Sequence, residues 1–492
     1  MHTMLQPAPL HALKTFHELV KLLPPAEQAK PQILILAGGI VTYRDDTDRE
    51  IVFRQESNFY YLSGCQVPGS YLVVVYQAGT SLAETPSVHL FIPKAELADM
   101  MWSVPPPSVE DASKTHDVTK VDHTAVLPDA LETLAKAYPD ALCHTLPRVS
   151  PLFSNLPGKY TDILLSSGEQ TLAVTDAFLL PALQRARLTK TEAEIAAIRQ
   201  ANQISSRAHE VVMRVLGAAV RGAITKGEGA GRRAEGRGRC TKPTCPSLRR
   251  QLARRHSITA ATIVLLIDAG CEWNCYASDI TRTMPVGNGG KFTPEARAIY
   301  ELVLEMQKES MKLLKPGLHW DDIQLLCHRV LIKGFQALGI FKSPSSPGSG
   351  SWNSAEAILA SGISSAFFPH GVGHSLGMDV HDVPEASKPT NNPTIQIGET
   401  KGHESFYSFL RLRLPLEKNM VVTVEPGCYF SPHLIAPVRD SKYINLDVLK
   451  RYEGVGGVRI EDVVLITEDG YENLTTVLSD VAWIEGVCSG EL

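Results

Sequence analysis

Short apolar runs rich in β-branched residues alternate with longer amphipathic segments in the first part of the chain. Residues 32 to 40, 70 to 76 and 88 to 93 form such runs, which predicts β-strands. Around 128 to 137 and 167 to 187 the apolar positions are spaced as in a helix. Strands and helices in alternation are typical of an α/β domain.

A helix with a clear start signal opens the second part. Thr191 is followed three residues later by Glu194, which is the pattern of a capping box. Apolar positions then recur at helical spacing: Ile195, Ile198, Ala201 and Ile204. Because 492 residues exceed one typical hydrophobic core, we expect two domains, at residues 1 to 184 and 185 to 492.

The second domain is expected to combine helices with a β-hairpin. Helical spacing continues at 293 to 314 and 320 to 338. Within residues 265 to 283 an apolar run places Asp268 at a strand end, and Asp279 follows eleven residues later. Two antiparallel strands joined by a short turn fit this pattern.

The composition is that of a water-soluble globular protein, with 44% hydrophobic and 21% charged residues. No run approaches the roughly eighteen apolar residues of a membrane span, and the N-terminus lacks the basic start and apolar core of a secretory signal. Nine cysteines without framework spacing fit a reducing compartment. We therefore expect a cytoplasmic protein with no membrane partner.

Potential metal ligands occur in order along the second domain: Asp268, Asp279, His374, Glu425 and Glu461. They stand in the motifs DAG, SDITRT, HGVGH, TVEPG and VRIED. A single Asp at a strand end is usually a turn residue. Glu425 differs, because it follows an apolar stretch and buried carboxylates are rare unless paired or metal-bound. An oxygen-rich donor set favours manganese or similar ions over structural zinc.

Charge balance favours two ions at such a site. Four carboxylates that converge without cations raise one another's pKa values. Two divalent ions contribute about four positive charges, and a pair about 3.5 to 4 Å apart can activate water as a nucleophile. We therefore expect two divalent ions per chain, with Mn²⁺ as the first choice, and metal-assisted hydrolysis.

These motifs, in this order, resemble those of the pita-bread metallopeptidases, in the branch of Xaa-Pro aminopeptidases and prolidases, and the resemblance covers most of the chain. Residues 53 to 65 (FRQESNFYYLSGC) resemble the signature of the family's non-catalytic N-terminal domain. The resemblance implies an α/β protein with a creatinase-like N-terminal domain and a pita-bread catalytic domain. For the aromatic residues of this segment we expect core packing.

The resemblance also implies roles for individual residues. The family's metal ligands match the candidate ligands named above. His370 in HGVGH and His381 in DVHD match histidines that contact substrate and move protons, and Tyr429 and Arg459 match the network behind the ions. In the implied mechanism Glu425 relays a proton and His381 stabilises the tetrahedral charge. A homodimer is also implied.

We expect an enzyme that releases the N-terminal residue of peptides with proline in the second position, a Xaa-Pro aminopeptidase. A Xaa-Pro dipeptidase (prolidase) is the alternative, because Arg411, fourteen residues before Glu425, could bind the carboxylate of a dipeptide or could be a surface charge. A catalytically impaired pita-bread protein that binds protein partners is the alternative outside the enzymes. The intact ligand set favours an enzyme.

Residues 229 to 256 do not fit this pattern. They contain eight Arg and one Lys against one Glu, so their net charge is about +8 and the rest of the chain carries about −13. Such a stretch is typical of a nucleic-acid-binding insert or of a solvated loop. Cys240 and Cys245 could form half of a zinc site, but no second pair has the required spacing. We expect no nucleic-acid partner.

A third interpretation of this stretch is a reading-frame error. At this position the family carries two strands and a substrate-facing histidine in a Leu-His-Tyr-x-x-Asn motif, which the chain lacks. Read from the third base of each codon, residues 255 to 262 permit Thr-Leu-His-Tyr-x-x-Asn, and residues 240 to 248 permit a second family-like string. Two matches in one frame favour an error over a real insert, so no role is assigned to His256.

Overall fold

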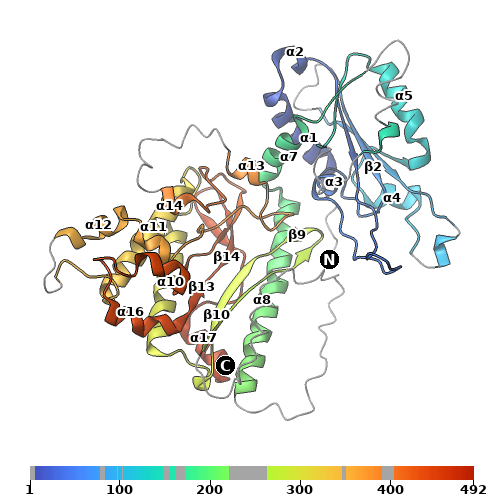
Figure 1. Cartoon of the computed structure of the whole chain (residues 1–492). Coiled ribbons are helices and arrows are strands. Elements are labelled where there is room, and N and C mark those ends of the chain that lie inside the picture. The colour runs from blue at the N-terminus through green and yellow to red at the C-terminus, as the bar shows by residue number, and fades with distance from the viewer. Residues whose placement is uncertain are drawn as a thin grey trace. The chain divides into compact units, whose positions relative to one another are not determined.

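The fold comes from a computed structural model of the chain (Figure 1). It describes residues 6–77, 84–96, 98–101, 104–147, 156–160, 172–220, 263–345, 351–389 and 404–492. The chain divides into two compact units: Met1–Leu188 with Glu192–Glu194, and Thr189–Thr191 with Ile195–Leu492. The domain boundary that we propose at residues 184 and 185 falls within helix α7 (Leu179–Leu188). The Arg-rich stretch, with Cys240, Cys245 and His256, lies outside the described residues.

The first unit is built on a six-stranded mixed sheet of strand order β4-β3-β2-β1-β5-β6. Its strands are β1 (Gln32–Ala37), β2 (Tyr71–Tyr76), β3 (Ser87–Ile92), β4 (Lys120–His123), β5 (Leu142–His144) and β6 (Ala173–Thr175). β2 pairs antiparallel with β1 and β3, and the other three pairings are parallel. Its described helices include, besides α7, α1 (Ala8–Leu22), α2 (Pro25–Gln28), α3 (Ser57–Ser63), α4 (Val109–Thr115) and α5 (Leu127–Ala137).

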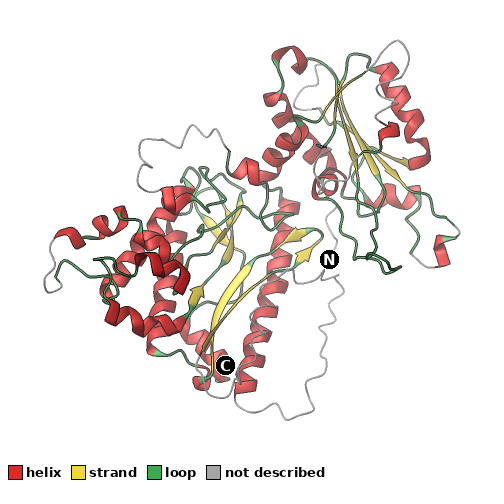
Figure 2. Ribbon diagram, in the orientation of Figure 1, coloured by secondary structure: helices red, strands yellow, loops and turns green. Residues whose placement is uncertain are grey.

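Helices cover both faces of this sheet (Figure 2). Every residue of β1 is buried, which accounts for its unbroken apolar sequence. Ile33 and Ile35 pack with Leu131 of α5 in one core cluster. Tyr76 of β2 instead stacks on Phe16 of α1, with ring centroids 4.2 Å apart. Successive side chains of a strand point to opposite faces of the sheet. Each face therefore presents apolar side chains to the helices that cover it.

The strands expected at 32 to 40, 70 to 76 and 88 to 93 are confirmed, as is the helix expected near 128 to 137. The helix expected from 167 to 187 is wrong in its described N-terminal part, because β6 occupies Ala173–Thr175 and the helix begins at Leu179. β6 pairs with β5, and this sheet pairing overrides the helical spacing. The aromatic residues of α3 are buried, which confirms their core role.

The second unit combines three long helices with short antiparallel sheets. The helices expected from the sequence are confirmed as α8 (Glu192–Val220), α10 (Pro294–Leu313) and α11 (Trp320–Ala337). Figure 1 shows α8 on one side of the strands and α10 and α11 on the other. The shorter helices are α12 (Ala355–Ala360), α13 (Pro384–Ser387), α14 (Glu404–Tyr407), α15 (Pro432–Ile435), α16 (Leu446–Tyr452) and α17 (Val481–Ser489).

The hairpin expected between residues 265 and 283 is confirmed. β7 (Ile263–Ala269) pairs antiparallel with β10 (Ile280–Val286), and the short strands β8 (Glu272–Trp273) and β9 (Tyr276–Ala277) pair at its tip. A Cβ on Gly270 would lie 1.8 Å from the carbonyl oxygen of Ser278, so only glycine permits this close approach of the two arms.

The remaining strands bring distant segments to this hairpin. β11 (Val421–Val424), β14 (Asp462–Ile466) and β15 (Tyr471–Asn473) form one antiparallel sheet, and β12 (Gly427–Tyr429) pairs with β13 (Gly457–Arg459). Isolated bridges join Thr281 to Glu461 and Ser375 to Val422. The segments that contain the candidate motifs are therefore tied together by backbone hydrogen bonds.

The cysteines expected to be reduced are buried in the part of the chain that the structure describes. Cys65, Cys143, Cys327, Cys428 and Cys488 form no disulfide there. Burial raises the pKa of the Cys327 thiol to about 12, as expected for a small apolar side chain that carries no reactive thiolate. Within the same residues, none of the helices has the length and apolar character to cross a membrane.

Candidate metal centre

The hairpin supplies two carboxylates from adjacent positions. Asp268 lies near the end of β7, opposite Thr281 of β10. Asp279 comes directly before β10, two residues from Thr281, and residues two apart along an extended chain face the same way. Asp268 and Asp279 are close enough for their side chains to share a hydrogen bond. This end of the hairpin thus forms an acidic corner.

Close backbone approach holds His374 and Glu425 side by side. The His374 N–H donates to Thr423 Oγ1 at 3.0 Å, and the Thr423 N–H donates to the His374 carbonyl at 3.0 Å. A Cβ on Gly373 would lie 2.0 Å from the Thr423 carbonyl oxygen, so this contact requires glycine. The Glu425 N–H donates to the Val372 carbonyl at 2.8 Å. The HGVGH and TVEPG segments are thereby fixed in register.

The imidazole of His374 directs one nitrogen at the carboxylates. Nδ1 lies 3.0 Å from the carbonyl oxygen of Ser375, to which it donates its hydrogen. Nε2 lies 3.5 Å from Oδ2 of Asp279 and 3.5 Å from Oε1 of Glu425. A histidine whose second nitrogen donates to a backbone carbonyl is oriented as metal-binding histidines usually are.

Glu461 completes a compact group of donors. Asp279, His374 and Glu461 offer ligand atoms that all lie within 4.8 Å of one another. Oε2 of Glu461 accepts a 2.6 Å hydrogen bond from Thr281, whereas its buried Oε1 has no hydrogen-bond partner among the described residues. A buried carboxylate oxygen without a partner is costly unless a cation binds it. This donor set therefore fits a divalent cation.

Burial and mutual repulsion control the pKa values of these carboxyl groups in the absence of metal. Burial raises the pKa of Asp268 to about 6 and that of Glu425 to about 7. Burial, followed by the charge of Asp279, raises the pKa of Glu461 well above its ordinary value. Burial also opposes ionisation of Asp279, but the hydrogen bond and charge of His374, together with the hydrogen bond from Asp268, outweigh it and lower that pKa. A cation in the site would relieve this repulsion.

A chain of hydrogen bonds connects Asp268 to His370. Arg459 donates to Asp268 through Nη2 and to the Tyr429 hydroxyl through Nη1 at 3.1 Å. His370 Nδ1 donates to the Gly371 carbonyl at 2.8 Å, so its Nε2 accepts from the Tyr429 hydroxyl at 2.7 Å. Burial, followed by Arg459, lowers the pKa of His370 to about 4. The ring is therefore neutral at neutral pH.

These groups open onto a cavity of about 590 Å³. Its wall includes Asp268, His370, His374, His381, Lys388, Phe409, Arg411, Glu425 and Arg459. His381 lies next to His374, edge to face. Arg411 is exposed, and its guanidinium makes no hydrogen bond to any residue that the structure describes. A cavity of this size, lined by convergent polar groups, suits a small ligand or the end of a peptide.

Three residues near the site were not singled out from the sequence. Thr281 accepts a hydrogen bond from Arg459 Nε at 3.1 Å. Lys190 and Asp382 form a buried ion pair of 3.2 Å. Thr281 could have been identified from the sequence, because it lies two residues after Asp279 in an expected strand. No local pattern pairs Lys190 with Asp382, because they are 192 residues apart.

Comparison with known proteins gives matches to both units. The profile of metallopeptidase family M24 matches residues 196–468, and that of the aminopeptidase P N-terminal domain matches residues 15–142. A probable Xaa-Pro aminopeptidase PEPP of Pyricularia oryzae is 39% identical over 93% of this chain and 92% of its own. A probable Xaa-Pro aminopeptidase pepP of Metarhizium acridum is 37% identical over 98% of this chain and 89% of its own.

Solved structures show the same architecture along the whole chain. The aminopeptidase PepP of Pseudomonas aeruginosa superimposes with a TM-score of 0.69 at 26% identity and covers 99% of each chain. Proline aminopeptidase P II of Yersinia pestis gives a TM-score of 0.67 at 25% identity, over 98% of this chain and 99% of its own. The α/β fold with a creatinase-like N-terminal domain and a pita-bread domain is thereby confirmed. This chain belongs to metallopeptidase family M24, in the branch that carries the aminopeptidase P N-terminal domain.

Proposed function

We propose that this protein is a Xaa-Pro aminopeptidase, which uses divalent metal to release the N-terminal residue of peptides with proline in the second position. The cluster of Asp279, His374 and Glu461 carries the proposal, because its donors fit a cation and His374 also lines the cavity. The names of the curated relatives support the substrate class.

The proposed site holds two ions, for which we favour manganese because four of the donors are carboxylates. The proposed ligands are Asp268, Asp279, His374, Glu425 and Glu461. Such ions, when bound, polarise a scissile carbonyl and lower the pKa of a nucleophilic water.

Glu425 is the group that we propose to move a proton. Its carboxylate lines the cavity, with Oε2 4.0 Å from Nδ1 of His370 and Oε1 3.5 Å from Nε2 of His374. A carboxylate at this position can accept a proton from the nucleophile and deliver it to the leaving amine. His370 lies on this side of the cavity. Its ring is held by a hydrogen bond from Tyr429, which Arg459 holds in turn.

His381 is proposed to stabilise the negative charge that develops on the substrate. It lines the cavity and contacts His374. Burial, followed by the charges of His374 and Arg411, lowers the pKa of His381 to about 4. A neutral imidazole has one N–H to donate, and a donor aimed at a developing oxyanion lowers the barrier to acyl transfer.

A Xaa-Pro dipeptidase is the second candidate, and one observation favours it. Arg411 lines the cavity and makes no hydrogen bond to the described residues, so its guanidinium is available to a free carboxylate. A dipeptide would place its carboxylate directly after proline, whereas a longer peptide would not. An impaired binding protein is disfavoured, because the described donors remain clustered.

The proposal also covers the location, oligomeric state and partners of the enzyme. The absence of a disulfide at Cys65, Cys143, Cys327, Cys428 and Cys488 within the described residues supports a cytoplasmic location. A homodimer is supported by the family resemblance alone. Proline-containing peptides are the proposed partners, and neither nucleic acid nor a membrane is proposed.

Purified protein, stripped of metal by a chelator and refilled with MnCl₂, tests the activity. Ala-Pro-Ala and Ala-Ala-Ala form a matched pair of peptides, and mass spectrometry detects the alanine that is released. We expect release from Ala-Pro-Ala alone, and only after the metal is restored. Cleavage of both peptides at equal rates, or of neither by the metal-loaded protein, would contradict the proposal.

A further inference from the structure

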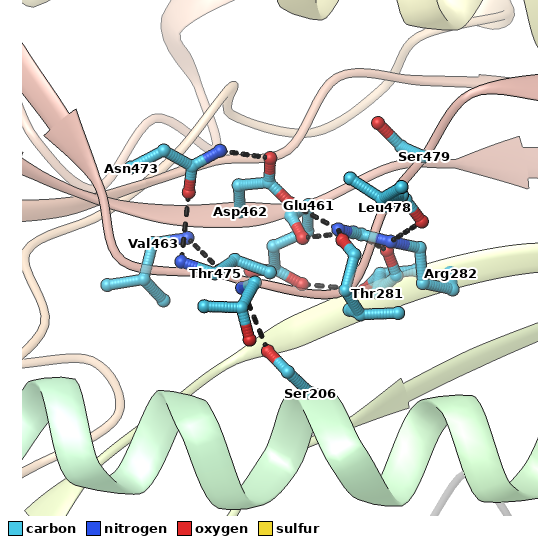
Figure 3. A network of polar contacts seen from close by, with 12 residues as sticks. Ser206, Thr281, Arg282, Glu461, Asp462, Val463, Asn473, Thr475, Leu478 and Ser479 are labelled. Carbon is cyan, nitrogen blue, oxygen red and sulfur yellow. Dashed lines mark hydrogen bonds and ion pairs between the residues drawn. The ribbon is translucent and has the colours of Figure 1, made fainter.

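Arg282 is a charged side chain inside the second unit, only 1% exposed, and its guanidinium is fully hydrogen-bonded (Figure 3). It donates to the carbonyls of Leu478 (3.2 Å), Thr281 (2.9 Å), Glu461 (2.8 Å) and Val477 (2.5 Å) and to Oδ1 of Asp462 (2.6 Å). A guanidinium carries five N–H donors, so these contacts use all of them.

Two of these contacts anchor the backbone at Glu461. Nη1 donates to the carbonyl of Glu461 itself, and Nη2 pairs with the carboxylate of the next residue, Asp462. Asp462 is held from its other side, because Asn473 Nδ2 donates to its Oδ2 at 2.8 Å. The chain is therefore fixed both at Glu461 and at Asp462.

The same strand also reaches the Glu461 carboxylate directly. Thr281, next to Arg282 in β10, donates to Oε2 at 2.6 Å, and its carbonyl accepts from the Glu461 N–H at 3.1 Å. Neighbouring residues of a strand point to opposite faces. Thr281 thus holds the carboxylate of Glu461, while Arg282 holds its backbone carbonyl (Figure 3).

Further hydrogen bonds connect this anchor to α8. Thr475 accepts from the Val463 N–H at 3.0 Å, and its own N–H donates to Oδ1 of Asn473 at 2.9 Å. The N–H of Thr476 donates to Ser206 of α8 at 3.0 Å. The position of Glu461 is therefore set by contacts that extend well beyond its own strand.

We propose that Arg282 is a positioning residue of the metal centre, which holds Glu461 in its binding position before any cation arrives. Burial of Arg282 and Asp462 removes both charges from water, and such a pair is a weak source of stability. Residues behind metal ligands commonly orient those ligands and raise metal affinity. The inference rests on the proposed metal centre and not on the proposed substrate.

Mn²⁺ binding to chelator-treated protein, measured by isothermal titration with MnCl₂ alone, tests this role. We expect Arg282→Met to raise the dissociation constant about 10- to 100-fold, the loss typical of a residue that supports a ligand. Arg187→Met is the matched control, because it removes another buried arginine, hydrogen-bonded to Asn58 in the first unit. We expect this control to keep the wild-type dissociation constant.

Melting temperatures with and without Mn²⁺ separate positioning from a purely structural role. A structural role lowers both melting temperatures equally and leaves Mn²⁺ affinity unchanged, and that result would overturn the inference. Arg282→Lys is the second variant, should the methionine variant fail to fold. It retains the charge beside Asp462 but has only three donors, so we expect folded protein with weakened Mn²⁺ binding.

Wild-type affinity in a folded Arg282→Lys protein would also overturn the inference. The proposed function fails differently: the wild-type protein would then bind Mn²⁺ normally and leave Ala-Pro-Ala intact. Metal titration and peptide cleavage therefore give independent answers.

Discussion

The ring of His381 stands at 87° to the ring of His374, with the two centroids 4.4 Å apart. His374 directs its Nε2 at Asp279 and Glu425, so it is engaged with the candidate metal ligands. His381 lies on the cavity wall beside it. His374 thus faces the candidate ligands, whereas its neighbour His381 faces the cavity.

Replacement of His381 by Ala should lower turnover by about 100-fold or more while metal stays bound, the size of effect expected for one transition-state donor. Steady-state kinetics and metal analysis of the same sample check both parts. His433→Ala, which removes an exposed histidine of α15, is the control and should be fully active. Metal loss in step with activity would make His381 a ligand instead.

Replacement of Asp279 or Glu461 by Ala should abolish peptidase activity and reduce the metal content, because each change removes a donor of the cluster. Atomic emission measurements after gel filtration give the metal content per chain. Glu468→Ala is the control, since its side chain is 77% exposed and pairs only with Lys418 among the described contacts. Full metal occupancy with normal turnover in either cluster variant would refute the ligand assignment.

Substrate length should separate the two peptidase candidates. An aminopeptidase accepts a chain that continues beyond proline, so Ala-Pro-Ala should be cleaved at least as well as Ala-Pro. Arg411→Ala should then have little effect on Ala-Pro-Ala. Arg413→Ala, whose guanidinium is already held by Asp321, controls for the loss of a nearby charge. Activity confined to Ala-Pro and lost specifically with Arg411 would establish the dipeptidase.

The raised pKa values of the site carboxyl groups should make a pH-dependent contribution to the stability of the metal-free protein. The folded protein binds protons on Glu425 more tightly than the unfolded chain, because burial raises that pKa from 4.5 to about 7. The pKa values of Asp268 and Glu461 are raised as well. A group with a raised pKa stabilises the fold fully below its unfolded value, and this contribution is lost as the pH approaches the folded value.

These carboxyl groups should therefore contribute less to the melting temperature of chelator-treated protein at pH 8 than at pH 5. His370 and His381 act in the opposite direction, because their lowered pKa values favour the fold as the pH rises. The carboxyl contribution is therefore measured by comparison with a variant. Glu461→Gln is the matched variant, because it removes one titrating carboxyl at nearly constant volume. We expect this variant to lose less stability from pH 5 to pH 8 than the wild type, because one carboxyl with a raised pKa is absent. An equal difference would show that other groups control the pH dependence.

The interpretation of residues 229 to 256 as a reading-frame error predicts a specific DNA sequence. Genomic DNA across codons 225 to 265 should contain an open alternative frame that encodes the Leu-His-Tyr-x-x-Asn motif. A protein translated in that frame should be more active and melt at a higher temperature than the present chain. DNA without such a frame would establish a genuine basic insert.

Much of the fold follows from local patterns in the sequence. The hairpin of β7 and β10 and the helices α8, α10 and α11 lie where apolar spacing predicts them. β6 was missed because its three residues are extended only through pairing with β5, which no local pattern reveals.

The candidate ligands could be named from their motifs, and the structure brings them together. Their roles as ligands stay a prediction. The residues behind them could not be found in this way, because the contact of Arg282 with Asp462 depends on which strands meet across 180 residues of sequence. Contacts of this kind are set by tertiary pairing, which single-sequence periodicity does not report.

The separation of the metal-site residues along the chain has a consequence for synthesis. Asp268 and Asp279 leave the ribosome early, but Thr281 meets Glu461 only after another 180 residues have been made. Until then the acidic corner of the hairpin lacks its carboxylate neighbour Glu461, and contacts between such distant residues form late in folding. We therefore expect a fragment that stops before residue 461 to lack one proposed ligand and to bind metal less tightly than the longer chain.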